Sequence, residues 1–336
     1  MVAEAEVLVE VHRKPVLESR HRGHVAIWHH DHGLIAAWGN VEARYLPRSS
    51  AKMIQALPLV ESGAADSFGL HTDHLALACA SHNGAAIHTD RVTRWLADLD
   101  LTEADLRCGA QWPNDDAASA ALICADAQSG QRHNNCSGKH SGFLTLNKHL
   151  GGGAEYIDPT HPVQRAVKQA WGEVTGEDQL DHAIDGCSAP NFVTRLTGLA
   201  KAMATFAAAS ETDGTRGAAM VRLRNAMMQH PDLVAGEGRA CTRLMRAMGH
   251  RATIKTGAEG VFIAIVPEHR LGIALKIEDG ATRAAEAVVA TLLGNLGVLN
   301  PQHADALAFT HGPILNRCER ETGHYRVAGT IQNWRL

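Results

Sequence analysis

The sequence predicts a mixed α/β (α+β) fold in which an antiparallel sheet from both chain ends lies beside a helical middle. Strand-like segments come first, helix-like segments fill the middle, and strand-like segments return near residue 252. Runs of strands kept apart from runs of helices are typical of α+β proteins. The 336-residue chain has no Pro/Ser-rich linker, so we expect one unit, residues 1–336, with two lobes. The sheet lobe is expected from about 1–50 and 251–336, and the helical lobe from about 51–250.

The strands are predicted from alternating or continuous apolar runs that are bounded by turn residues. They are 7–11, 24–28, 34–38, 252–255, 261–266 and 271–277. Residues 31–33 are predicted to close a hairpin between the second and third strands, and residues 268–270 one between the last two. His29, His30 and His32 lie at the first tip, where the pattern favours a solvated turn over a metal site.

The helices are predicted from apolar residues at helical spacing. The first spans 51–61 and ends at Gly63, with Pro58 marking a kink or an early end, and we expect it to be buried. Further helices are predicted at 72–79, 88–99, 117–127, 162–171, 193–209, 215–229 and 239–248. The segment 280–293 is predicted as the closing helix.

Composition excludes several classes of partner. The net charge is −4, and the chain has neither a basic block nor a long apolar span, so we expect no nucleic-acid or membrane partner. Residues 1–6 are acidic and lack the charged-then-apolar pattern of an export signal, which predicts a cytoplasmic protein. The seven scattered cysteines do not resemble a disulfide framework, and most are expected to be reduced core residues.

A Ser-x-x-Lys pair, Ser49 and Lys52, follows the first predicted hairpin. If a helix begins at about Ser49, this spacing places both side chains on one face, with their β-carbons about 5–6 Å apart. A neutral lysine can then serve as the base that a serine nucleophile needs, provided that burial or a second cation lowers its pKa. The alternative is that Ser49 or Ser50 caps a helix and Lys52 is solvated.

Two further motifs follow in the order found in penicillin-recognising serine enzymes: Ser81-x-Asn83, and Lys255-Thr256-Gly257 on a predicted strand. Lys255 would supply the second positive charge, Ser81 would relay protons, and Asn83 would bind a substrate carbonyl or fix a lysine. Each also has a structural interpretation: a surface lysine, a helix-end hydroxyl and a turn.

Five longer segments resemble the Rhizobium etli-type L-asparaginases, and the resemblance covers nearly the whole chain. They are 47–52 (PRSSAK), 81–84 (SHNG), 133–140 (HNNCSGKH), 185–192 (DGCSAPNF) and 255–260 (KTGAEG). The resemblance implies a fold similar to serine β-lactamases, penicillin-binding proteins and serine-dependent glutaminases. It also implies a Ser49–Lys52 pair and a Ser81–Lys255 pair in one site, which hydrolyses L-asparagine to L-aspartate and ammonia. We expect a homodimer with a small-molecule substrate.

The resemblance also implies a zinc ion held by Cys136, Lys139 and Cys187. Two thiolates suit Zn²⁺, but a lysine must lose its proton to coordinate, and spacing alone would favour His133 or His140 as the third ligand. The alternative is a pair of buried thiols. Such a zinc would position the substrate or stabilise the structure, because serine already supplies the nucleophile.

The remaining motif positions are Arg48 and Asp185, which the resemblance implies as ligands of the substrate's carboxylate and ammonium groups. The nearest rival is a glutaminase, because one extra methylene changes binding by only about 1–3 kcal/mol in a simple pocket. A β-lactamase or peptidase would act outside the cytoplasm and need an export signal. A non-catalytic zinc-binding protein would be expected to lack catalytic residues, whereas all four are present.

Overall fold

The computed structural model describes residues 4–336, which form two compact units. The first holds residues 4–50, Arg195–Ala208 and Arg243–Leu336, and the second holds Ala51–Thr194 and Ala209–Thr242. The boundary near the Ser-x-x-Lys pair falls between Ser50 and Ala51.

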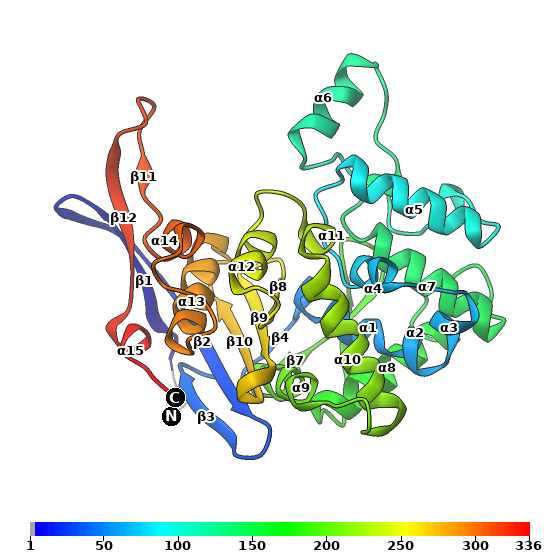
Figure 1. Ribbon diagram of the computed structural model, residues 1–336, viewed down its shortest axis with the longest axis horizontal. Helices are drawn as coiled ribbons and strands as arrows, with labels where there is room; N and C mark the ends of the chain where they lie inside the picture. The colour runs from blue at the N-terminus through cyan, green and yellow to red at the C-terminus, as the bar shows by residue number, and fades with distance from the viewer. Residues whose placement is uncertain (1–3) are drawn as a thin grey trace. The chain divides into compact units, whose positions relative to one another are not determined.

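An eight-stranded antiparallel sheet organises the first unit (Figure 1). The strand order is β11-β12-β1-β2-β10-β9-β8, and β3 also pairs with β2. The strands are β1 (Glu6–Arg13), β2 (Val16–His29), β3 (Gly33–Trp38), β8 (Thr253–Thr256), β9 (Val261–Val266), β10 (Leu271–Ile277), β11 (Ile314–Leu315) and β12 (Glu321–Val327). Both chain ends contribute strands and the middle is mainly helical, so the predicted fold class is confirmed.

Two helices pack on this sheet. Helix α9 (Leu196–Ala208) contacts β10, β2 and β9, and α13 (Thr282–Asn295) contacts β9 and β10. Every residue of β9 is buried, as expected for a strand that is covered on both faces. A β-carbon at Gly272 of β10 would collide with the backbone of Ala200, so glycine allows α9 to lie close to the sheet. Helix α9 therefore belongs to the sheet unit, although it comes from the middle of the sequence.

The C-terminal strands β11 and β12 were not predicted. In β12 only Gly323 and Val327 are buried, so its sequence, ETGHYRV, lacks the apolar alternation that indicates a strand. The strand forms because it pairs with β1, with Val9 opposite Val327 and Val11 opposite Tyr325. That pairing joins segments more than 300 residues apart in the sequence, so a local sequence pattern cannot predict it.

The second unit is mainly helical. Its helices are α2 (Leu57–Glu61), α3 (Ala64–Ser67), α4 (Thr72–Ala78), α5 (Ala86–Asp98), α6 (Asp116–Cys124), α7 (Ser137–Leu150), α8 (Pro162–Thr175), α10 (Gly214–Gln229) and α11 (Pro231–Ala235), preceded by α1 (Lys52–Gln55). The predicted helix 51–61 is buried but divided, with Pro58 in the first turn of α2. Helix α12 (Ala240–Met248) crosses into the first unit, where α14 (Ala304–Thr310) and α15 (Gly329–Gln332) lie.

Helix α7 is central to the second unit and was not predicted. It contacts α2, α3, α4, α5 and α8, and all its residues from Ser137 to Asn147 are buried. Because it is enclosed on every side, its sequence needs no apolar stripe, and it includes Gly138 and Gly142. A β-carbon at Gly138 would meet the Leu77 backbone, so this glycine lets α7 lie directly against α4.

The seven cysteines are free thiols, and all except Cys124 and Cys318 are buried. Among residues 4–336, no helix combines the length and the apolar character needed to cross a bilayer.

Candidate active site

The turn that carries Ser49 belongs to the first unit. Residues Arg48–Ala51 form a 3-10 helix that continues directly into α1, which begins at Lys52. Arg48 has φ 54°, a left-handed conformation that is costly for a residue with a side chain. Ala51 is the N-cap residue of α1, and no side chain caps this helix, so the capping alternative for the two serines is not observed.

The two serines of this turn have different surroundings. Ser50 is fully buried, and its hydroxyl donates to the carbonyl of Pro47 at 2.7 Å. Ser49 is partly exposed, and its hydroxyl makes no hydrogen bond to a described residue of its own unit. Ser50 therefore stabilises the turn, while the Ser49 hydroxyl is available for chemistry.

The Lys255-Thr256-Gly257 motif lies against the same turn. A β-carbon at Gly257 would be 2.6 Å from the Pro47 oxygen and 3.1 Å from the Ser50 nitrogen. Only glycine allows this approach, which places the end of β8 beside Ser49. The Gly257 N–H donates to Val261 O at 2.7 Å, so it is not available to an oxyanion.

Lys255 itself is fully buried on β8, and its amine donates to Thr256 O at 2.9 Å. The surface-lysine alternative is therefore wrong. Lys52, in the second unit, is only 1% exposed, which excludes a solvated lysine as well. Its amine donates to the carbonyls of Ala80 and, at 3.5 Å, Asn135. The Lys52 amine therefore lies beside Ala80, the residue that precedes Ser81.

The Ser81-His82-Asn83-Gly84 turn is held against the start of α7 by His82, a residue to which the motif analysis gave no role. The Gly84 N–H donates to Nδ1 of His82, so the proton on this ring is on Nε2, which donates to Ser137 Oγ at 2.9 Å. The His82 N–H also donates to Asn135 O at 3.2 Å. His82 therefore fixes the position of its neighbours in the turn.

Asn83 has partners for both ends of its amide. Its Oδ1 accepts from the Ala85 N–H at 3.3 Å, and its Nδ2 donates to Asp115 at 3.1 Å. Gly236 lies so close that a β-carbon there would collide with the Asn83 amide. In this structure Asn83 joins three segments of the second unit, and a substrate carbonyl would have to share or displace one of these bonds.

The two predicted thiol ligands meet in the second unit. Cys136 is the N-cap residue of α7, and Cys187 lies in the loop between β5 (His182–Ile184) and β6 (Pro190–Phe192). Both are buried, and the Cys136 thiol donates to Oδ1 of Asn135 at 2.9 Å. Lys139, on the first turn of α7, donates to Cys187 Sγ at 3.0 Å.

Electrostatics make this group a charged pair. The neighbouring Cys136 thiol and the positive charge of Lys139 lower the pKa of Cys187 well below its usual value. The proximity of Cys187 and burial raise the pKa of Cys136. Burial would lower the pKa of Lys139, but the charges of Cys187 and Cys136 outweigh burial and raise it. These shifts favour a negative charge on Cys187 beside a positive charge on Lys139.

This donor set fits a zinc ion in part. Two sulfur atoms and one nitrogen atom converge, as Zn²⁺ prefers, although Cys136 and Lys139 must both give up a proton to bind it. Within residues 4–336, no three His, Cys, Asp or Glu side chains are placed to hold a metal ion, so neither His133 nor His140 completes such a cluster. His133 accepts instead from the Gly130 N–H at 3.0 Å.

The structure thus places the predicted residues in two groups. The first unit holds Arg48, Ser49 and Lys255 around the Pro47–Ala51 turn. In the second unit, Lys52 lies beside the residue before Ser81, and its charge acts on Cys136, while that of Asp185 acts on Lys139. The Asp185 carboxylate accepts from the Gly186 N–H at 2.7 Å.

Comparisons with known proteins agree with the sequence motifs. The model of the family described as L-asparaginase II matches residues 9–327. No curated protein matches the chain. Solved structures with a similar fold include a β-lactamase from Mycobacterium bovis, at 14% identity over 79% of this chain and 89% of that chain, with a TM-score of 0.45. A Bacteroides dorei protein named as a β-lactamase has 10% identity over 77% and 87% of the two chains, with a TM-score of 0.43.

A third similar structure is the octameric penicillin-binding protein homologue of Pyrococcus abyssi, at 12% identity over 81% of this chain and 73% of that chain, with a TM-score of 0.35. At these identities and scores the three structures say nothing about activity. The family match covers nearly the whole sequence and includes all the motifs described above. The chain belongs to the L-asparaginase II family and is an amidohydrolase.

Proposed function

We propose that this protein hydrolyses L-asparagine to L-aspartate and ammonia through an acyl-enzyme on Ser49. The observation that carries the proposal is the contrast between the two serines of the turn. The Ser50 hydroxyl donates a hydrogen bond to Pro47 O. Ser49, by contrast, is partly exposed and lies three residues before Lys52 in the sequence, whose side chain is buried. A serine with an available hydroxyl next to a lysine removed from water is the arrangement that nucleophilic catalysis requires.

In the first half of the reaction, Ser49 Oγ attacks the side-chain amide carbon of asparagine, and its proton passes to a neutral Lys52 amine. Lys52 then donates this proton to the departing nitrogen, which leaves as ammonia, and an aspartyl ester remains on Ser49. In the second half, water attacks the ester while Lys52 takes its proton. The bond to Ser49 Oγ breaks, the serine regains its proton, and aspartate is released.

Ser81 and Lys255 form the second pair of the proposed site. Lys52 donates to the carbonyl next to Ser81, which supports a proton relay between them. Lys255 is buried at the end of the strand that lies against the Ser49 turn, and we assign it as the partner of Ser81. Since the Gly257 N–H is already bonded to Val261 and the Ser50 N–H to Pro47, the proposed oxyanion donor in this turn is the N–H of Ser49 itself.

We assign Arg48 and Asp185 to the carboxylate and ammonium groups of the substrate, and Asn83 to the support of the Ser81 turn. Cys136, Lys139 and Cys187 would hold a zinc ion. When bound, this ion would supply a fixed positive charge and would tie the 185–189 loop to the start of α7. Ser49 remains the nucleophile in this scheme, so the zinc serves to position asparagine.

Ammonia release from asparagine and glutamine, measured beside the hydrolysis of a chromogenic β-lactam, tests the proposal. We expect kcat/KM to be highest for asparagine, and the β-lactam to be left intact. A higher value for glutamine would make the protein a glutaminase. Absence of turnover of all three by folded, zinc-loaded protein would support the non-catalytic alternative.

A further inference from the structure

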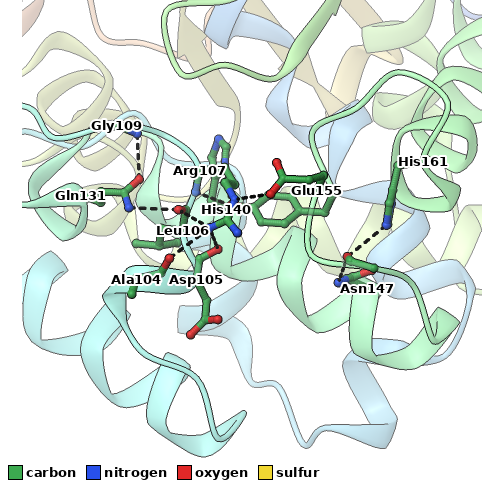
Figure 2. A network of polar contacts seen from close by, with 12 residues as sticks. Ala104, Asp105, Leu106, Arg107, Gly109, Gln131, His140, Asn147, Glu155 and His161 are labelled. Atoms are coloured by element: carbon green, nitrogen blue, oxygen red, sulfur yellow. Dashed lines mark hydrogen bonds and ion pairs between the residues drawn. The ribbon is translucent and has the colours of Figure 1, made fainter.

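The turn of residues 81–84 is hydrogen-bonded to two other segments of the second unit. In the segment before α7, Asn135 O accepts from the His82 N–H at 3.2 Å. That segment is anchored by Gln131, whose side chain accepts from the Gly109 N–H at 2.9 Å (Figure 2). The other segment is the five-residue helix α11, which none of the sequence motifs includes. Helix α11 packs on α4, the helix that precedes the turn, so it can set the position of the turn.

The carbonyls of α11 make these bonds because a helix leaves its last carbonyls without partners inside the helix. Val234 O accepts from the Ser81 N–H at 2.9 Å, and Asp232 O accepts from Nε2 of His88 at 2.9 Å. His88 is fully buried, and its ring stacks on that of His82, with centroids 4.6 Å apart and planes 9° from parallel. The backbone of one short helix thus holds Ser81 directly and supports His82 through His88.

Gly236, the residue after α11, allows this arrangement. It has φ 106° and ψ 163°, a conformation that is essentially restricted to glycine. A β-carbon there would lie 2.4 Å from Cγ and Oδ1 of Asn83. Gly236 O accepts from the hydroxyl of Thr242 at 2.6 Å, and the same hydroxyl lies 3.0 Å from Pro231 O. Because Thr242 is fully buried, its hydroxyl ties the start of α11 to the residue that follows the end of this helix.

We propose that Gly236 and Thr242 are positioning residues, which hold α11 where its carbonyls fix the Ser81 turn for proton transfer. This inference rests on the role of Ser81 in the proposed reaction. Gly236 lets the chain beyond α11 lie against Asn83, and Thr242 holds Gly236 to the start of the helix. A substitution at either residue acts on the reaction through the position of Ser81, so it should lower kcat more than it alters KM.

The bond from the Ser81 N–H to Val234 O can be followed without substrate, by hydrogen exchange detected with NMR. We expect the Ser81 amide to exchange at least about tenfold faster in Gly236→Ala and in Thr242→Val than in the wild type, and the amides of α8 to change by less than about threefold. Gly238→Ala is the matched control: Gly238 also has a positive φ, 76°, but no described atom lies within 4 Å of a β-carbon there. Wild-type exchange at Ser81 in both test variants would overturn the proposal.

Steady-state kinetics with asparagine separate positioning from stability. Valine removes the Thr242 hydroxyl and keeps the shape of the side chain, whereas serine keeps the hydroxyl. We expect kcat to fall at least about tenfold in Thr242→Val with KM within about threefold of wild type, and Thr242→Ser to retain most of kcat. Thr175→Val is the control, because this buried hydroxyl donates to Trp171 O within α8. Equal losses of kcat in Thr242→Val and Thr175→Val would contradict a positioning role.

Ser81→Ala shows which claim fails. If this variant hydrolyses asparagine as fast as the wild type, the role of Ser81 in the proposed reaction is wrong, and the positioning role falls with it. If Ser81→Ala is inactive while Thr242→Val and Gly236→Ala keep the wild-type kcat, the proposed reaction stands and only the positioning role is overturned.

Discussion

Gly257 packs against Pro47 so closely that any side chain would displace the turn that carries Ser49. The β-carbon of alanine would lie 2.6 Å from the Pro47 oxygen, well inside normal contact. This contact fixes the third motif of the sequence against the first, within one unit. It relates two segments that are about 200 residues apart and explains why a glycine follows Lys255-Thr256.

Gly257→Ala is therefore expected to lower kcat for asparagine about a hundredfold, the scale of a misplacement of about 1 Å, and to destabilise the fold by about 1–3 kcal/mol. Gly153→Ala is the control, because nothing lies within 4 Å of a β-carbon at that position. Steady-state kinetics and urea unfolding would measure both effects. Wild-type kcat in Gly257→Ala would mean that the turn does not need this support.

The two serines of the turn should separate activity from stability. Ser49→Ala should abolish ammonia release and leave the free energy of unfolding nearly unchanged, because its hydroxyl has no partner in its unit. Ser50→Ala should retain most of the activity but lose about 1 kcal/mol of stability with its bond to Pro47. Activity in Ser49→Ala near the wild-type level would end the proposed mechanism.

Lys52→Met and Lys255→Met should each lower kcat at least about a hundredfold, the usual effect of losing a general base or its electrostatic partner. Both lysines are buried, and both would act on one proton transfer, so the effects should not multiply in the double variant. Lys201→Met, on the exposed side of α9, serves as the control. A double variant that shows the full product of the two losses would place the lysines in independent roles.

The double variant Cys136→Ser, Cys187→Ser should lose its zinc and show a raised KM with kcat lowered less, since lost binding that is common to ground and transition states appears in KM. Metal content should also fall as the pH drops, because the ligands must be deprotonated. The exposed pair Cys124→Ser, Cys318→Ser is the matched control. Full zinc retention in the first variant would exclude these thiols as ligands, and complete loss of kcat would make zinc part of the chemistry.

Acid should destabilise the fold through His88. This residue is fully buried in α5 and donates to Asp232 O at 2.9 Å, and burial lowers its pKa. Below about pH 6.5 the unfolded chain binds a proton here that the folded chain does not, so the free energy of unfolding must fall as the pH falls. Urea unfolding should be measured at several pH values from about 7.5 to about 5.5. The free energy of unfolding should fall less steeply over this range in His88→Gln than in the wild-type protein. Equal slopes in the two proteins would mean that His88 does not contribute.

Local patterns were sufficient for six strands of the antiparallel sheet, for most of the longer helices and for the position of Ser49 in the chain. They failed where burial is complete or pairing is distant. Helix α7 carries Lys139 and His140, yet its enclosure on all sides removes the apolar stripe that indicates a helix. Strand β12 depends on its pairing with β1 at the other end of the sequence.

The predicted site residues show the same limit. The spacing of Ser49 and Lys52 within one segment could be predicted, because chain connectivity alone keeps them close. The hydrogen bonds from Asn83 to Asp115 and from Ser50 to Pro47 could not be predicted, because they depend on the path of the backbone. His82 lay within a motif that was identified, but only its two ring bonds reveal that it holds the turn.

The central claim is that Ser49 carries the acyl group, and trapping that intermediate tests it most directly. Asparagine would be mixed with the enzyme, quenched in acid within the first turnover, and the digested protein analysed by mass spectrometry. We predict an aspartyl ester on the peptide that contains Ser49, which is absent from Ser49→Ala and present in Ser50→Ala. An ester on any other residue, such as Ser81, would contradict the account, as would rapid turnover of asparagine by the Ser49→Ala variant.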